Sequence, residues 1–183
     1  IKKKYMKLFL KFIVYILLVY KTFADDFIMT VTGIDQFPSF VKVDENTIFM
    51  TFNNRAQFTT NTSMFGFGVC EGTVEIINGD QKQNILCTIT DSYKNKGYLK
   101  AIPASRNKNV GNMIGDRLGS SIASWQWVGG DGPFEELKGV IMTGAYFQMG
   151  KNKHGDGNFI WRGKAEGLSA KLIERINNYK RPE

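Results

Sequence analysis

Few residues in this 183-residue chain could carry out chemistry. The one histidine, His154, lies in a stretch of glycine, lysine and aspartate that is typical of an exposed turn. A lone loop histidine does not indicate a nucleophilic triad. The acids to consider first are Asp91, Asp131 and Glu135, and each is predicted to lie in a turn. The sequence contains no Gly-x-Ser-x-Gly, His-Glu-x-x-His or P-loop pattern. We therefore predict no metal site and no cofactor, and we favour a function without catalysis.

The two cysteines are the second feature with chemical consequences. Cys70 and Cys87 flank Asn78-Gly79, which is the strongest hairpin signal in the chain, because a type I′ turn needs positive φ at both central positions. With this turn Ile77 faces Asp80, and counting outward along both strands places the two cysteines directly opposite each other. They fall on a non-hydrogen-bonded pair, where Cα atoms lie roughly 4.5 Å apart, within reach of a disulfide. We predict a structural disulfide, and the alternative catalytic or metal role has no CxxC motif or histidine partner to support it.

The same register separates two faces of the hairpin. It pairs Glu75 with Lys82 and Thr73 with Asn84 on a face that suits solvent. The cysteine face is apolar and is predicted to be the interior, although Gln81 and Gln83 would also point inward near the hairpin tip and would need water or polar partners.

The rest of the chain from Asp25 alternates polar and apolar residues with a period of two, which indicates strands. Turn clusters such as Asn53-Asn54 and Lys94-Asn95-Lys96 separate the predicted strands. These strands cover residues 27–32, 47–52, 65–77, 84–90, 97–102, 121–128, 140–148 and 158–166. Many short strands at this spacing are typical of a sandwich or a barrel. We count seven to nine strands and predict one all-β domain over residues 25–183, a sandwich or a barrel with a short C-terminal helix.

Large aromatic side chains are the candidate ligand-binding residues, because strand alternation places them on interior faces. They are Trp125, Trp127, Tyr146 and Trp161. Glycines share these faces, as Gly163 does with Trp161. Two interpretations are open: the glycines make room for rings in a filled barrel, or they border a cavity for a small apolar ligand.

The first 24 residues have the pattern of a cleaved signal peptide. Lysines precede an apolar run over residues 12–20, and Thr22-Phe23-Ala24 places small residues before a cut at Asp25. A retained anchor is the alternative, but a membrane span needs roughly 20 apolar residues. We predict a periplasmic or secreted domain with no membrane span after cleavage. Because the chain begins with Ile1, its true start is open.

Removing this leader changes the charge of the protein. The whole chain has 24 basic and 17 acidic residues, and six lysines but no acid lie within residues 1–24. The mature part therefore has 18 basic and 17 acidic residues, a net charge of +1. The basic charge that would support binding to nucleic acid is therefore largely removed with the leader, and we predict no nucleic-acid partner.

Two segments interrupt the strand pattern. Residues 105–119 are polar and glycine-rich and are predicted to form a long loop. Near the C-terminus, apolar residues recur on one helical face, namely Leu168, Leu172, Ile173, Ile176 and Tyr179. This pattern predicts a short amphipathic helix that docks on the barrel, with binding to a membrane surface as the alternative.

Three segments match motifs of a known group of proteins. The stretch Trp125–Gly139 resembles the GGxGxFxxxxG turn of the allene oxide cyclase and dirigent barrels, with Phe134 expected to tuck under the barrel rim. Gly66–Cys70 is similar to their glycine-bearing strand before a hairpin, and Phe159–Gly163 to their late strand. The resemblance covers roughly residues 60–167. It implies an eight-stranded antiparallel barrel, often a trimer, with a hydrophobic cavity in the enzymatic members. On this resemblance we predict that the all-β domain is a single antiparallel eight-stranded barrel with the short C-terminal helix. No residue here is matched to the catalytic carboxylate of the cyclases or to the paired acids of the dirigent pocket.

These observations leave functions from different classes. The first is an exported, non-catalytic barrel that binds a small apolar ligand or serves as a structural or interaction protein. The alternative is a cofactor-free cyclase or isomerase that shapes a hydrophobic substrate in a dry cavity. Alternation also predicts that Phe49, Phe65 and Phe67 face outward. Exposed aromatics in a row suggest that the C-terminal helix or a neighbouring subunit, as in a homotrimer, covers them.

Overall fold

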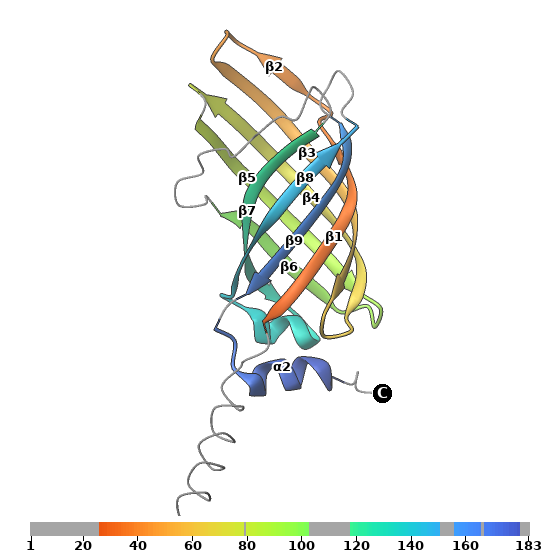
Figure 1. The fold of residues 1–183 in the computed structure, drawn as a ribbon. Coiled ribbons are helices and arrows are strands. Elements are labelled where there is room, and N and C mark those ends of the chain that lie inside the picture. Colours follow the sequence, from red (N-terminus) through yellow and green to blue (C-terminus); the bar gives the residue numbers. More distant parts are fainter. Residues whose placement is uncertain (1–25, 79, 103–117, 151–155, 166, 180–183) are drawn as a thin grey trace, which may run out of the picture.

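The computed structural model describes residues 26–78, 80–102, 118–150, 156–165 and 167–179. The predicted leader and its cut, most of the predicted loop at 105–119, and His154 lie outside these residues. Figure 1 shows strands that wrap around a common axis, with two short helical segments at one end. The strands are β1 (Phe27–Gln36), β2 (Phe40–Lys42), β3 (Thr47–Thr60), β4 (Phe65–Ile77), β5 (Asp80–Asp91), β6 (Lys96–Ile102), β7 (Leu118–Gly130), β8 (Ile141–Met149) and β9 (Gly157–Ala165). The helical segments are η2 (Gly132–Leu137), which is a 3₁₀ helix, and α2 (Ala170–Asn177).

Eight of these strands form a closed antiparallel barrel. From β3 to β9 each strand pairs with the next one in the chain, and β1 lies between β9 and β3 and closes the ring. The predicted eight-stranded barrel with a C-terminal helix is therefore confirmed. The short strand β2 was not predicted, and it pairs only with β3, outside the barrel.

The central hairpin has the predicted register. Asn78 adopts a positive φ of 52°, and Cys70 pairs with Cys87 across β4 and β5. The solvent-face pairs Glu75 with Lys82 and Thr73 with Asn84 also occur as predicted. Gln83 pairs with the buried Val74 and therefore lies on the interior side of the hairpin as predicted, although its side chain is exposed. The side chain of Gln81 lies outside the described residues. Only Leu86–Thr90 of β5 pairs with β6, so the tip of the hairpin extends past the neighbouring strand.

Alternation sorts the side chains into an interior and an exterior. Along β9, Phe159, Trp161, Gly163 and Ala165 are buried, while Arg162 and Lys164 are exposed. The three outward phenylalanines are exposed as predicted, at 39%, 56% and 60% for Phe49, Phe65 and Phe67. The apolar interior provides the main driving force for folding, since burial of each large side chain contributes roughly 1.5–3 kcal/mol.

The strands β1 and β3 run well past their predicted ends. The strand β1 continues to Gln36, and β3 runs without a break through Asn53-Asn54, which was wrongly predicted to be a turn. These asparagines stay in an extended strand because β3 is paired on both sides at this point, with β1 and with β4. Tertiary pairing thus overrides the local turn preference of asparagine.

Helical segments cover one end of the barrel. In η2, Phe134 and Leu137 are fully buried, so the phenylalanine tucks under the rim as expected. In α2, Ile173 and Ile176 are buried, and Arg175 pairs with Glu136 of η2 at 2.8 Å. This burial confirms docking of the amphipathic helix rather than the membrane-surface alternative. Within the described ranges, no helix has the length and apolar character required to cross a bilayer.

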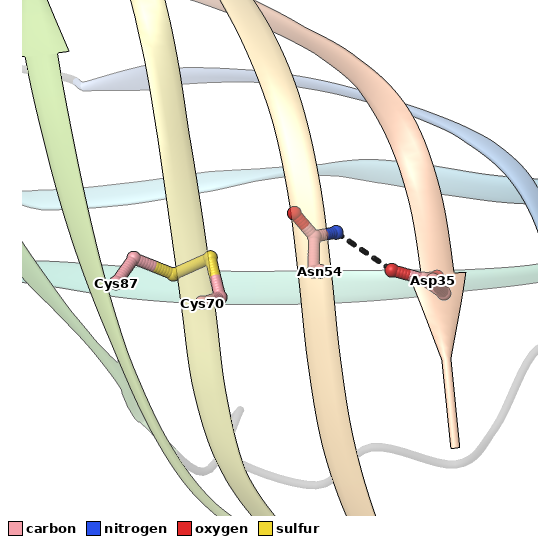
Figure 2. The surroundings of a disulfide bond; sticks show 4 residues. All are labelled: Asp35, Asn54, Cys70 and Cys87. Atoms are coloured by element: carbon pink, nitrogen blue, oxygen red, sulfur yellow. Dashed lines mark hydrogen bonds between the residues drawn. A yellow bond between two sulfur atoms is a disulfide. The ribbon is translucent and has the colours of Figure 1, made fainter. Parts of the chain in front are cut away.

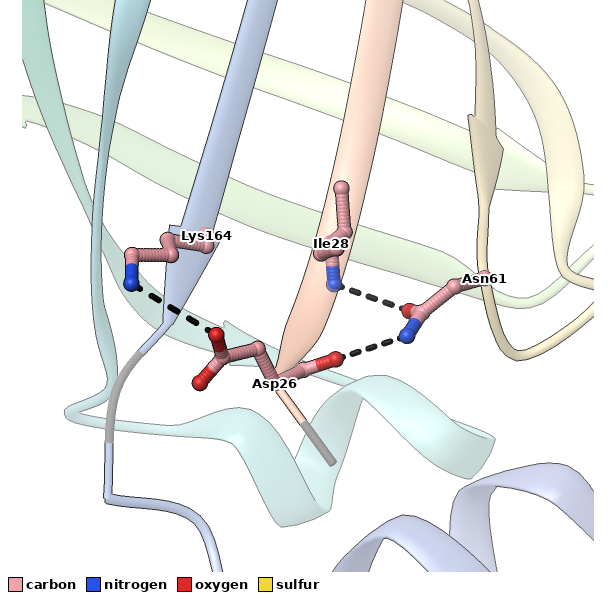
Figure 3. Close-up of polar contacts among 4 residues, drawn as sticks. All are labelled: Asp26, Ile28, Asn61 and Lys164. Atoms are coloured by element: carbon pink, nitrogen blue, oxygen red, sulfur yellow. Dashed lines mark hydrogen bonds and ion pairs between the residues drawn. The ribbon is translucent and has the colours of Figure 1, made fainter. Parts of the chain in front are cut away.

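Polar contacts hold the start of β1 at the same end of the barrel (Figure 3). The side chain of Asn61, just after β3, accepts from the Ile28 backbone N–H at 2.8 Å and donates to the Asp26 carbonyl at 2.6 Å. The Lys164 ammonium lies 3.5 Å from the Asp26 carboxylate. The side chain of Asn61 therefore continues the hydrogen bonding of β1 beyond the end of its ladder with β3. These bonds fix the start of β1, the strand that closes the barrel.

Candidate functional site

A buried carboxylate lies inside the barrel near the end of β1. Asp35 is fully buried, and its Oδ1 accepts a hydrogen bond from Asn54 Nδ2 at 2.6 Å. Its Oδ2 accepts from Gln148 Nε2 at 3.3 Å and also from the Tyr146 hydroxyl. We call these four residues the polar cluster. Three donors offset much of the cost of removing a carboxylate from water.

Strand register brings the polar cluster together. Asp35 pairs directly with Asn54 across β1 and β3, and both side chains are buried in the barrel interior. Tyr146 and Gln148 lie two residues apart on β8, so their side chains share a face. The carboxylate of Asp35 is thereby reached by Asn54, which lies about 20 positions away in the chain. It is also reached by Tyr146 and Gln148, which lie about 110 positions away.

The tyrosine of the cluster is held as a neutral donor. Burial in the barrel, together with the negative charge of Asp35, raises the pKa of Tyr146 far above its ordinary value of 10.0. The ring stacks on Phe159, with centroids 5.7 Å apart and an interplanar angle of 19°. Its hydroxyl therefore remains protonated at neutral pH and donates to the carboxylate.

The polar cluster borders a cavity in the barrel. The cavity has a volume of about 80 Å³, taken as the space open to the centre of a water-sized sphere. A single water needs about 10–15 Å³ of such space, so the cavity exceeds the space that one water requires. Aliphatic and aromatic side chains make up most of the wall, among them Met29, Val31, Phe52, Phe58, Ile89 and Leu99. Asp35, Asn54 and Tyr146 supply its polar portion.

Three of the four predicted ligand-binding residues line this cavity, namely Trp125, Tyr146 and Trp161. The fourth, Trp127, lies apart from it and stacks on Phe134 with centroids 5.3 Å apart. Trp161 is anchored by its indole N–H, which donates to the Ala123 carbonyl at 3.2 Å. Rigid rings therefore form part of the wall, while Trp127 packs toward the end of the barrel covered by η2.

Glycines make room for these rings, as the first interpretation from the sequence expected. A Cβ added to Gly163 would lie 2.2 Å from the Trp161 ring. One added to Gly97 would lie 2.7 Å from Trp127 and 2.8 Å from Phe134. The rings fill the space above these glycines, and the cavity is the interior volume that the rings leave open.

The disulfide also belongs to the cavity wall. Cys70 and Cys87 are bonded with an S–S distance of 2.04 Å and a Cα separation of 3.9 Å, closer than the roughly 4.5 Å expected for such a pair. Cys70 pairs across the ladder with Asn54, which in turn pairs with Asp35. Figure 2 shows Asn54 between the disulfide and the carboxylate. The predicted pairing is confirmed, and the bond constrains the strands beside the polar cluster.

The acids singled out from the sequence do not line the cavity. Asp91 accepts three hydrogen bonds, from the backbone N–H groups of Tyr93 and Asn95 and from the Asn95 amide, and so organises the turn between β5 and β6. Asp131 accepts from the Lys96 backbone N–H, and Glu135 is exposed on η2. Their contacts are those of turn and surface residues.

Sequence reasoning missed Asp35 and Asn54 for one shared reason. Both follow the point at which the predicted strand was ended, after residue 32 and after residue 52. The signal was present, because alternation continues through Gly33 to Asp35 on β1 and through Asn54 to Ala56 on β3. The predicted strand in β1 ended before Asp35 was reached, and the one in β3 ended because Asn53-Asn54 was interpreted as a turn.

The fold and the site define the class of this protein as a closed antiparallel β-barrel with an internal, largely apolar cavity. Among the described residues, no group of three or more histidine, cysteine, aspartate or glutamate side chains is placed to hold a metal ion. The chain matches no protein-family model, no curated protein and no solved structure.

Proposed function

We propose that this protein is an exported, non-catalytic barrel that binds a small, mainly apolar molecule in its interior. The observation that carries the proposal is the cavity bounded by Trp125, Trp161 and the disulfide. Binding sites for small molecules are concave and mainly apolar, with a few polar groups that orient the ligand, and this cavity has that composition. Burial of apolar ligand surface would supply the affinity.

Native mass spectrometry of the protein purified from an oxidising export compartment tests this proposal. We expect an adduct of small mass that organic solvent removes. Ala56 lines the cavity, so Ala56→Leu should reduce the adduct by filling space. Ala145→Leu is the matched control, because Ala145 is exposed on β8. A bare protein that also fails to take up added apolar probes would refute ligand binding.

A cofactor-free isomerase or cyclase is the second candidate, and Asp35 is the observation that favours it. A carboxylate at the wall of an apolar cavity can act as a general base. However, its oxygens already accept hydrogen bonds from Asn54, Tyr146 and Gln148, so a substrate proton would have to displace one of these donors, which supports binding instead. Incubation of the recovered ligand with wild type and with Asp35→Asn distinguishes the two. A product formed only by wild type would favour the enzyme.

Export from the cytoplasm is part of the proposal. The disulfide supports it, because such bonds persist in oxidising compartments. Expression of the full chain in a bacterial host, followed by fractionation and N-terminal sequencing, tests it. We expect a periplasmic or secreted product that begins at Asp25, and a product that retains residues 1–24 in the membrane would contradict it.

Self-association is a further element of the proposal. Phe65 and Phe67 are exposed on β4, so the docked helix α2 leaves both side chains uncovered. A homotrimer, as the resemblance to the allene oxide cyclase and dirigent barrels implies, would cover them. Light scattering on the eluting protein measures the mass, and Phe67→Ser should dissociate the assembly. A wild-type monomer at high concentration would refute it.

A further inference from the structure

One buried hydrogen-bond acceptor in the cavity wall lacks a partner. Asn54 is 5% exposed, and its amide nitrogen is committed to Asp35. Its Oδ1 has no hydrogen-bond partner among the described residues. In Figure 2 this oxygen points away from Asp35 and toward the side of the disulfide. Buried polar groups in native proteins are nearly always satisfied, so this exception calls for an explanation.

The orientation of the amide follows from its neighbour. An ionised carboxylate only accepts hydrogen bonds, and donors from Tyr146 and Gln148 already converge on Asp35. Asn54 must therefore turn its nitrogen toward the carboxylate and its oxygen away. The adjoining residue across the ladder is Cys70, whose sulfur is bonded to Cys87 and carries no hydrogen to donate. Asn54 is one of the residues that line the cavity, so a molecule bound there is the candidate donor to this oxygen.

We propose that the ligand is a neutral, mainly apolar molecule with a hydroxyl or N–H group that donates to Asn54 Oδ1. This inference rests on the proposed function and specifies its ligand class. The apolar part of the molecule would lie against Trp125 and Trp161, and its polar end would meet the polar cluster.

The same geometry disfavours carboxylates such as fatty acids. A ligand carboxylate would bring a second negative charge close to Asp35 and would offer Asn54 Oδ1 another acceptor instead of a donor. A cation would be attracted to Asp35, but three protein donors already occupy that carboxylate, and burying an unpaired charge in an apolar cavity is costly.

Four aliphatic probes of similar size test the inference on the wild-type protein. They are 1-hexanol, its isomer methyl pentyl ether, hexanoate and hexane. The alcohol and the ether both accept hydrogen bonds, but only the alcohol donates one. None of them absorbs where tryptophan does, so the fluorescence of Trp125 and Trp161 reports binding. We expect 1-hexanol to bind at least about tenfold more tightly than the ether, as one satisfied buried acceptor implies.

A pair of variants assigns the preference to one atom. Asn54→Leu keeps the approximate size of the side chain and removes its oxygen, so the alcohol and the ether should then bind with similar affinity. Asn84→Leu is the matched control on the solvent face of β5 and should keep the wild-type preference. If Asn54→Leu fails to fold, the wild-type ranking of the four probes still decides the question.

The outcomes separate this inference from the proposed function. Equal affinity of wild type for 1-hexanol, ether and hexane would overturn the head-group inference while supporting an apolar binding cavity. Tightest binding of hexanoate, or an unchanged preference in Asn54→Leu, would also overturn the inference. If no probe binds at all, the proposed binding function itself is refuted.

Discussion

The hydrogen bond between Tyr146 and Asp35 can be tested by a double-mutant cycle on folding stability. Tyr146→Phe removes one donor from a carboxylate that keeps Asn54 and Gln148 as partners. A hydrogen bond to a charged group contributes roughly 1.5–3 kcal/mol, and we expect a loss of that size in the free energy of unfolding. Asp35→Ala should cost more, about 3–5 kcal/mol, because it leaves three buried donors without their acceptor.

The coupling between the two changes is the decisive quantity. If the tyrosine acts through Asp35, Tyr146→Phe should cost little once Asp35 is alanine, so the coupling energy should be about 1.5–3 kcal/mol. Urea unfolding with the disulfide intact, followed by circular dichroism, measures each variant. Tyr98→Phe is the control, because Tyr98 lies on the outer surface of β6 and should change stability by less than about 0.5 kcal/mol. Additivity of the two changes within about 0.5 kcal/mol would refute the interaction.

Three further predictions concern the wall and the titration of the site. Replacing both cysteines by serine should cost about 3 kcal/mol of unfolding free energy, because the bond closes a loop with a sequence separation of 17; a cost below about 1 kcal/mol would contradict this. Gly163→Ala should destabilise the barrel by roughly 1–3 kcal/mol through its clash with Trp161, whereas Gly129→Ala, where an added Cβ meets nothing within 4 Å, should be nearly neutral; equal midpoints in thermal unfolding would contradict this. Finally, the raised pKa of Tyr146 makes the folded state resist ionisation that the unfolded chain undergoes near pH 10.0, so its contribution to stability is complete below that pH and is lost as pH rises above it. Stability of the wild type, measured by urea unfolding from pH 8 to 11, should therefore fall more steeply than that of Tyr146→Phe, and parallel curves would contradict the shift.

Local sequence rules predicted the features that depend on neighbouring residues alone. The Asn-Gly turn defines which residues face each other for a dozen positions on each strand, so the pairing of Cys70 with Cys87 followed by counting. Alternation likewise indicated the buried and exposed faces of β9 and the amphipathic helix α2. The period of the hydrophobic residues depends directly on which side chains are buried, and for this reason it predicted these faces correctly.

The polar cluster was beyond such rules, because it depends on contacts between distant strands. An aspartate near the end of β1 and an asparagine within β3 look like turn residues, and only the register of β1 with β3 shows that they face each other inside the barrel. The donors on β8 are more than 100 residues away from Asp35 in the chain.

The sequence by itself determined that the chain forms antiparallel strands with a disulfide-linked hairpin, because turn chemistry and side-chain alternation are local properties. Closure of the ring through β1 decided which residues share the interior, since it alone brings β1 between β3 and β9. The cavity and the unpaired oxygen of Asn54 are products of that closure, because the space left between packed rings depends on how all eight strands meet.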